Sequence, residues 1–335
     1  MPNPPEITEQ YRAAVSEVVL WRRNDRGLIE ICGADRAGWL NNLVTNVVKA
    51  LAAGEGNYAF ATNVKGRTLF DLNLLVLEDR LWLDLDRRQT EAAIKHFDRH
   101  IITEDVRLAD LSPTTGRLTI VGPRAHEAVA QMGLGNLVPM AQLQHVAGKI
   151  GGADVRMVRN DCVGLLGAEL IVRVDDLAGV SDRIVQAGAE TGIRPLDDAA
   201  AEVLRIEAGI PASIVDIDEE VVPPETGQVE RGISYHKGCY LGQEVIERMR
   251  SHGVLARLLV GIRVEGDGPI ARGAAVQVDS QEVGRVTSSC WSEAIGARLA
   301  LGYVKTARAN PRTTVTITDG DRQRSGVVMA LPVRR

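Results

Sequence analysis

The sequence changes character near Gly253, and this change constrains the fold more than any other feature. Before it, strand-like and helix-like segments alternate along the chain. After it come only short strand-like segments, such as VLARLLVGIRVE, VGRVTSS and TTVTITD, parted by Gly, Asp, Asn and Pro. A run of short strands without helices is typical of a small antiparallel barrel or sandwich. We therefore predict a C-terminal β-barrel domain over residues 251–335.

The part before residue 250 follows one pattern twice. LIEIC, NYAFATNV, TLFDLNLLVLE and RLWLDLD read as strands before a helix near 89–101, and RLTIVG, ADVRMV and ELIVRV with their helices repeat the pattern after residue 115. A chain of 335 residues is too long for one ordinary core. We predict an α+β fold in which two mixed α/β lobes with antiparallel sheets, residues 1–115 and 116–250, precede the barrel.

Composition excludes several classes of function. A net charge of -5 argues against a general nucleic-acid binder. The chain has no run of about 18 apolar residues and its start does not resemble a signal peptide, so we expect a cytoplasmic protein with no direct contact to nucleic acid or membrane. Cys32, Cys162, Cys239 and Cys290 lie far apart and are expected to be free thiols. The usual dinucleotide, P-loop and hydrolase motifs are missing from the sequence.

The strand at 68–77 has two different faces. Thr68 and Phe70 begin a largely apolar face, whereas Asp71 and Asn73 are neighbours on the other. That polar pair is typical either of a half-exposed sheet or of a polar cluster that lines a pocket. In RLWLDLD, the acids at positions 84 and 86 alternate with inward leucines, so we expect both to be solvated.

An acid interrupts the apolar stripe of the helix around DDAAAEVLRIEAGIP. Glu207 shares a helical face with Ala200, Val203 and Leu204, the face that should meet the core. A buried carboxylate must be paired or hydrogen-bonded. Two alternatives stay open: an ion pair with an arginine such as Arg205 or Arg231, or hydrogen bonds from a ligand with paired N–H donors, such as a pterin ring.

The stretch YHKGCYLGQE surrounds Cys239 with groups that could activate it. Lys237 and His236 supply positive charge, and a helix that begins near Gly242 would stabilise a thiolate at its N-terminus. A small buried thiol in a tight turn is the alternative. Because an iron–sulfur cluster usually needs four protein ligands, we expect no permanently bound metal, although one thiolate could share a cluster or a sulfur with a partner.

This stretch also carries a resemblance to a known family. KGCYLGQEV, followed by Arg248, resembles the K-G-C-[YF]-x-G-Q-E signature of the YgfZ-type folate-binding proteins, which assist the maturation of iron–sulfur proteins. Other matching segments include GADRAGWLNNLVTN, KGRTLFDLNLLV, LRIEAGIP, PPETG and VGRVTSS. The barrel segment resembles the C-terminal domain of the broader aminomethyltransferase (glycine-cleavage T-protein) superfamily. The motif residues are Lys237, Gly238, Cys239, Tyr240, Gly242, Gln243 and Glu244.

The resemblance implies a site for tetrahydrofolate, or a one-carbon derivative of it, in a central opening. Glu207 falls on the superfamily acid that recognises the pterin, and we expect Asp71, Asn73, Tyr58 and Arg248 to contribute to the same site.

Position 71 also bears on the reaction. Asp71 lies where T-proteins carry an adjacent Asp–Asp pair, but here the pair reads Phe70–Asp71, which counts against aminomethyl transfer.

Three functions compete at this point. The first is a folate-dependent accessory protein that serves iron–sulfur proteins or their assembly machinery, including radical enzymes that modify tRNA; Cys239 would then act with Lys237, which lowers its pKa. The alternative is a tetrahydrofolate-dependent aminomethyltransferase in which Asp71 acts on the amine. The third is a binding module in which folate is only a structural ligand and Cys239 is inert.

Overall fold

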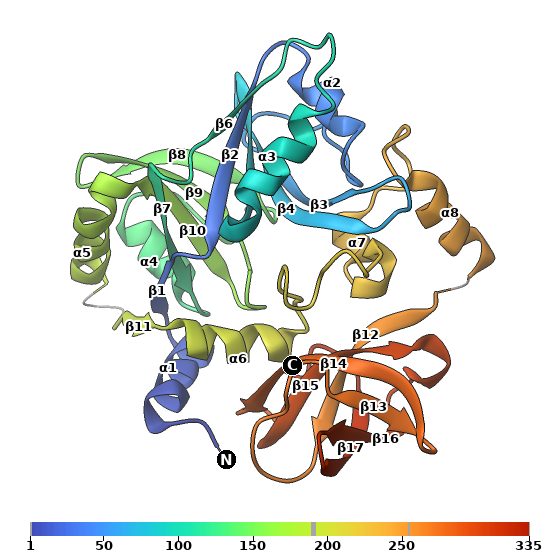
Figure 1. The fold of residues 1–335 in the computed structure, drawn as a ribbon. Helices are drawn as coiled ribbons and strands as arrows, with labels where there is room; N and C mark the ends of the chain where they lie inside the picture. The colour runs from blue at the N-terminus through green and yellow to red at the C-terminus, as the bar shows by residue number, and fades with distance from the viewer. Residues whose placement is uncertain (1, 189–191, 254, 335) are drawn as a thin grey trace.

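The structure is a computed structural model that describes residues 2–188, 192–253 and 255–334. Two antiparallel-rich sheets with their covering helices form the upper part of the molecule, and a barrel lies below them (Figure 1). None of the helices within the described residues is long and apolar enough to cross a membrane. The α+β fold class with a C-terminal barrel is confirmed.

A five-stranded antiparallel sheet forms from the early part of the chain, in the order β3-β4-β5-β2-β6. Alternating apolar residues of its strands pack under α2 and α3 in one hydrophobic cluster, which buries that face. The elements are β2 (Arg26–Cys32), α2 (Arg36–Asn41), β3 (Gly56–Thr62), β4 (Thr68–Val76), β5 (Arg80–Asp86), α3 (Thr90–Asp98) and β6 (Arg107–Asp110).

A six-stranded sheet follows, in the order β11-β1-β7-β10-β9-β8. Its strands pair antiparallel except β1 with β11, and α4 and α5 cover one face. The elements are β1 (Val19–Arg23), β7 (Thr115–Val121), α4 (Ala125–Gln131), β8 (His145–Ile150), β9 (Ala153–Arg159), β10 (Gly167–Arg173), α5 (Leu177–Ala187) and β11 (Arg194–Leu196). Because β1 pairs with β7 and β11, the first strand of the chain belongs to the sheet of the second lobe rather than to the sheet of the first.

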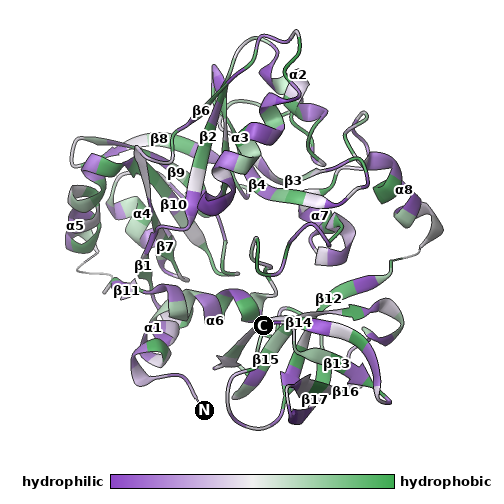
Figure 2. Ribbon diagram, viewed as in Figure 1, coloured by the Kyte–Doolittle hydropathy of each residue, from purple (hydrophilic) through white to green (hydrophobic). Residues whose placement is uncertain are grey.

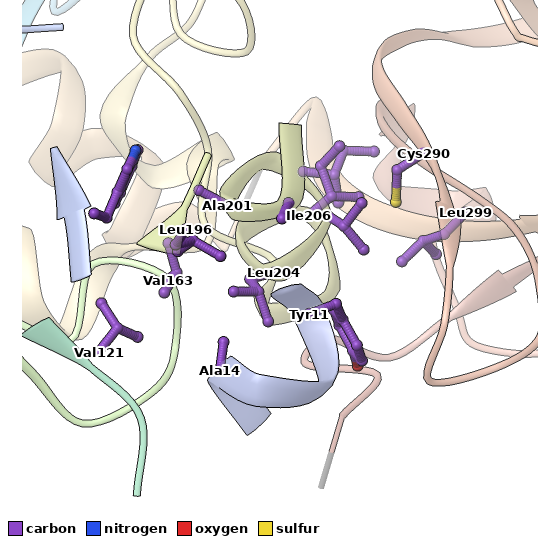
Figure 3. Packing of buried hydrophobic residues seen from close by; sticks show 14 of the residues in the cluster. Tyr11, Ala14, Val121, Val163, Leu196, Ala201, Leu204, Ile206, Cys290 and Leu299 are labelled. Carbon is purple, nitrogen blue, oxygen red and sulfur yellow. The ribbon is translucent and has the colours of Figure 1, made fainter. Parts of the chain in front are cut away.

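Helix α6 joins the lobes to the barrel. It contacts α1 on one side and the barrel strands β14 and β15 on the other (Figures 1 and 3). Buried side chains from all of these elements form a single hydrophobic cluster around it, including Tyr11, Leu204 and Leu299. The helices outside the two sheets are α1 (Pro5–Ser16), α6 (Asp198–Ala208), α7 (Val229–Gly232) and α8 (Gln243–His252).

The barrel closes in the order β12-β15-β14-β13-β16-β17. Hydrophobic and hydrophilic residues alternate along its strands (Figure 2). The hydrophobic side chains that point inward fill the core of the barrel. Helix α8 ends at His252, and the first barrel strand begins five residues later. The strands are β12 (Arg257–Val264), β13 (Ala275–Val278), β14 (Gln281–Ser292), β15 (Ala297–Lys305), β16 (Thr314–Asp319) and β17 (Arg322–Met329).

Candidate functional site

A cavity of about 400 Å³ lies where the inner faces of the two sheets meet α6. This volume is within the range of small-molecule sites, about 300–1,000 Å³. Its walls carry many charged side chains of both signs. The charged lining residues are Arg23, Asp25, Arg26, Asp71, Asp86, Arg88, Asp198, Glu202, Arg205 and Arg231.

Asp71 and Asn73 both line this cavity, because strand alternation in β4 turns them away from α3. Asp71 is buried, with 8% of its surface exposed, and its Oδ2 accepts a 2.9 Å hydrogen bond from the Tyr58 hydroxyl. The Ser213 hydroxyl donates to its Oδ1. The structure therefore brings together three of the expected site residues, Tyr58, Asp71 and Asn73. It adds Ser213, which no sequence pattern predicts.

Tyr58 connects this carboxylate to a cation. Burial and the neighbouring Asp71 carboxylate raise the pKa of Tyr58 well above its ordinary value, so the phenol stays protonated and donates. The guanidinium carbon of Arg231 lies 4.0 Å from the Tyr58 ring centroid, a cation–π contact. Arg231 thereby reaches the cavity from α7.

Asp84 and Asp86 are buried, which corrects the expectation that both are solvated. Asp84 is 2% exposed, and its Oδ2 accepts hydrogen bonds from Arg26 Nη2 and Asn73 Nδ2, both at 2.8 Å. Arg117 Nη2 lies 3.6 Å from its other oxygen. The six-stranded sheet covers this face of β5, and strand alternation alone does not predict that a second sheet packs there.

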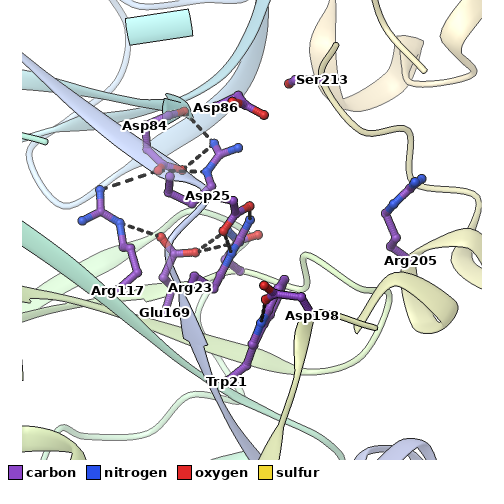
Figure 4. Close-up of polar contacts among 12 residues, drawn as sticks. Trp21, Arg23, Asp25, Asp84, Asp86, Arg117, Glu169, Asp198, Arg205 and Ser213 are labelled. Carbon is purple, nitrogen blue, oxygen red and sulfur yellow. Dashed lines mark hydrogen bonds and ion pairs between the residues drawn. The ribbon is translucent and has the colours of Figure 1, made fainter. Parts of the chain in front are cut away.

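The charges behind the cavity form one network (Figure 4). Arg117 Nε also lies 3.2 Å from Glu169 Oε1, and Arg23 Nη1 lies 3.3 Å from the other oxygen of the same carboxylate. Burial opposes ionisation of Asp84, but Arg26 and Arg117 prevail and lower its pKa to about 2. Burial and the nearby Asp84 charge raise the pKa of Glu169.

Helix α6 presents two acids to the cavity, Asp198 and Glu202. Neither of them was predicted as a site residue from the sequence. Asp198 accepts a 2.8 Å hydrogen bond from the Trp21 indole, and Glu202 pairs with Arg205. Asp198, Ala201, Glu202 and Arg205 lie at i, i+3, i+4 and i+7 and all line the cavity. Their spacing could have indicated this, because these four residues form a stripe of α6 opposite its apolar stripe.

Glu207 is buried as the apolar stripe predicts, but it does not line the cavity. Its oxygens accept hydrogen bonds from the Tyr11 hydroxyl at 2.7 Å, the Ser292 hydroxyl at 2.6 Å and the Ala294 N–H at 3.0 Å. Arg334 Nη1 lies 3.7 Å from Glu207 Oε2, within the range of an ion pair. Glu207 meets neither Arg205 nor Arg231; the arginine beside it is Arg334, and Glu207 fastens α6 to α1 and the barrel instead of lining the cavity.

Cys239 is an exposed free thiol outside the cavity lining, in the loop between α7 and α8. Lys237 is expected to activate it through positive charge, but the hydrogen bonds of Lys237 go to another segment. The Lys237 ammonium donates to the carbonyl oxygens of Asn41, Val44 and Asn46 at 2.6, 2.7 and 2.6 Å. An ammonium has three donors, so none is left for the sulfur. Burial lowers the pKa of Lys237 to about 8.

The remaining motif residues shape this loop. Gly242 has φ +84°, and a Cβ there would lie 2.5 Å from the Asn63 carbonyl oxygen. Tyr240 is buried and its N–H donates to Gln243 Oε1 at 3.3 Å, while Gly238 has open space around it. Glu244 is exposed in the first turn of α8.

Arg248 is exposed further along the same helix. It does not line the central cavity, so the structure separates it from Asp71. Within the described residues, no group of three or more His, Cys, Asp or Glu side chains is placed to hold a metal ion.

Comparison with known proteins agrees with this architecture. The chain is 26% identical over 328 residues to an aminomethyltransferase of Halalkalibacterium halodurans. The aligned region covers 97% of this chain and 89% of that protein. A chloroplastic putative transferase of Arabidopsis thaliana is 25% identical over 307 residues, covering 91% and 69%. The structure of the glycine cleavage system aminomethyltransferase T from Bartonella henselae shares the fold, with a TM-score of 0.83, 20% identity, and coverage of 99% and 91%.

Two family domains span almost the whole chain. The GCVT N-terminal domain matches residues 4–234, which hold both sheets and the cavity. The glycine cleavage T-protein C-terminal barrel domain matches residues 257–333. The chain therefore belongs to the glycine cleavage T-protein family, within the aminomethyltransferase superfamily.

Proposed function

We propose that this protein binds a reduced folate in the central cavity and takes part in one-carbon transfer, as a tetrahydrofolate-dependent aminomethyltransferase does. The observation that carries the proposal is Asp71, a buried carboxylate that lines a ligand-sized cavity in a chain of the T-protein family. Relatives named aminomethyltransferase match nearly the whole length of the chain and support the same activity.

The lining fits the chemistry of a folate. Asp198 and Glu202 offer carboxylate acceptors for ring N–H donors, and Arg231 offers a cation for a carboxylate. Trp21 and Tyr58 supply aromatic surface beside them. Tetrahydrofolate, when bound, supplies the amines that carry the one-carbon unit, and the residues of this chain bind and orient it.

Asp71 is suited to act on an amine. Two hydroxyl donors, from Tyr58 and Ser213, fix the orientation of its carboxylate. A carboxylate held in this way can pair with a protonated amine or accept its proton at the cavity wall.

Phe70, next to it, does not weigh against this role. Its side chain lies on the opposite face of β4, in the cluster under α3. An acid at position 70 would point away from the cavity, so the position that can serve the cavity is 71.

A titration tests the binding. Tetrahydrofolate should bind the wild-type protein, and Asp71→Asn and Glu202→Gln should each weaken the affinity by about tenfold or more, since each removes a charged acceptor. Glu219→Gln, at an exposed acid, serves as the matched control. Formation of methylenetetrahydrofolate from an aminomethyl-carrying lipoyl protein would support the transferase activity. If tetrahydrofolate does not bind the wild-type protein, the proposal fails.

A second candidate rests on Cys239. The thiol is exposed outside the cavity, where a partner protein could reach it, and aminomethyl transfer does not need it. This favours the YgfZ-type function, in which a folate-binding accessory protein assists the assembly or repair of iron–sulfur proteins, including enzymes that modify tRNA. The partners would be those proteins or their assembly machinery.

Complementation separates the two candidates. In a strain that lacks the gene and has impaired iron–sulfur enzymes, Cys239→Ala should fail to restore their activity although the purified variant binds tetrahydrofolate normally. Cys290→Ala is the control for loss of a thiol. Full complementation by Cys239→Ala would exclude the thiol from the function and leave the transferase candidate.

A further inference from the structure

The loop that carries Cys239 is fastened to one segment of the first lobe, residues 41–46. Lys237 provides the centre of this attachment through its hydrogen bonds to three carbonyl oxygens of that segment. Asn41 is the last residue of α2, so its carbonyl has no partner within the helix. A cation is favourable at such a C-terminus. Three backbone carbonyl oxygens thus hold the ammonium of Lys237, which lies two residues before the cysteine in the chain.

Further hydrogen bonds flank the cysteine on both sides. Before it, the Ser234 N–H donates to Thr45 O at 3.0 Å. After it, the Leu241 N–H donates to Asn42 O at 3.0 Å. The loop therefore meets the same short segment at three points, and Cys239 lies between the second and the third.

The same segment is joined to the cavity wall. Asn46, whose carbonyl accepts from Lys237, donates through its side-chain amide to Tyr58 O at 2.8 Å and Arg231 O at 2.9 Å. Tyr58 and Arg231 both line the cavity. One residue thus links the attachment of the cysteine loop to the residues around Asp71.

We propose that Lys237 is a positioning residue: its ammonium fixes the Cys239 loop on residues 41–46, and through Asn46 sets the place of the thiol relative to the cavity wall. It acts on the thiol through the backbone and not as its hydrogen-bond donor. The proposal concerns the thiol of the second candidate function, but testing it requires neither folate nor a partner protein.

Hydrogen exchange on the full-length protein provides the test. Lys237→Met removes the ammonium and keeps the apolar stem, so exchange at the Ser234 and Leu241 amides should become at least about tenfold faster while the barrel strand β15 stays protected. Alkylation of Cys239 by iodoacetamide should not slow down. Lys65→Met, at an exposed lysine of the neighbouring β3–β4 hairpin, is the matched control and should change neither measurement.

Chemical rescue makes the test specific. In Lys237→Ala, methylammonium chloride should restore protection at both amides, whereas sodium chloride at the same ionic strength should not. Asn46→Ala keeps the three carbonyl acceptors of Lys237, so those two amides should stay protected. Faster exchange there in this variant would overturn the proposal, because it would show that the side chain of residue 46, and not the ammonium, holds the loop. Unchanged protection in Lys237→Met would overturn the proposal. Slower alkylation with unchanged exchange would overturn it in favour of direct activation of the thiol.

Discussion

Asp84 shows how much a single residue depends on what covers it. Alternation along β5 places it opposite the leucines, on the side that was expected to meet water. The structure packs the six-stranded sheet there, and Arg26 and Arg117 neutralise the carboxylate. Asp71 and Asn73 follow the same rule of alternation, but for them a pocket was among the expected outcomes. The rule predicts the face of a residue, and the tertiary packing decides its environment.

Loss of the Asp84 charge should be costly. Asp84→Asn leaves Arg26 without its buried carboxylate partner and Arg117 with Glu169 alone, so the free energy of unfolding should fall by about 3–5 kcal/mol. Urea denaturation followed by circular dichroism measures this loss. Asp79→Asn, at an exposed acid paired with its neighbour Arg80, should change stability by less than about 0.5 kcal/mol. Equal losses in both variants would contradict the buried network.

His145 should make stability depend on pH. Burial, with the adjacent Arg156, lowers its pKa from 6.5 to about 4. Between these pH values the unfolded chain binds a proton that the folded chain does not, so stability falls as the pH drops. This residue alone should account for about 2 kcal/mol between pH 7 and 5. His145→Gln should flatten that part of the curve, and an unchanged slope in the variant would refute the assignment.

At the scale of elements, helix α6 was read only in part from the sequence. Its apolar stripe correctly predicts the buried face and the burial of Glu207. The hydrogen-bond donors to Glu207 include Tyr11 and Ser292, which lie far from it in the sequence. No local sequence pattern can predict such partners. The acids of the opposite face, Asp198 and Glu202, look like solvated residues until the second wall of the cavity is known.

The loop before α8 gives a prediction with a built-in control. Gly242→Ala forces a side chain into a left-handed backbone conformation against the Asn63 carbonyl, so it should destabilise the protein by about 1–3 kcal/mol. Gly238→Ala in the same motif meets open space and should stay within about 0.5 kcal/mol. Thermal denaturation of both variants measures the difference. Equal stability would mean that Gly242 does not approach the Asn63 carbonyl as described.

On the scale of the whole molecule, the change of pattern near Gly253 predicts a separate barrel, and the repeated strand–helix pattern predicts two lobes. The exchange of β1 into the second sheet was not predictable, because it depends on which strands meet in space. The cavity exists only where both sheets and α6 come together. Its composition therefore could be anticipated at Asp71 and Asn73, while Trp21, Ser213 and Arg231 required the structure.

Glu207 tests how the barrel is attached. Glu207→Gln places an N–H₂ group among donors from α1 and the barrel, so stability should fall by about 2–3 kcal/mol. The affinity for tetrahydrofolate should stay within about threefold, because the side chain lies outside the cavity. Urea denaturation and calorimetry measure the two effects. A loss of affinity at full stability would return Glu207 to the binding site.

A crystal structure of the protein with tetrahydrofolate would show whether the cavity beside Asp71 is the folate site. The ligand should lie between the inner faces of the two sheets, within hydrogen-bond distance of Asp71 and of Asp198 or Glu202. Tetrahydrofolate bound elsewhere, with this cavity filled only by water, would mean that the cavity is not the folate site.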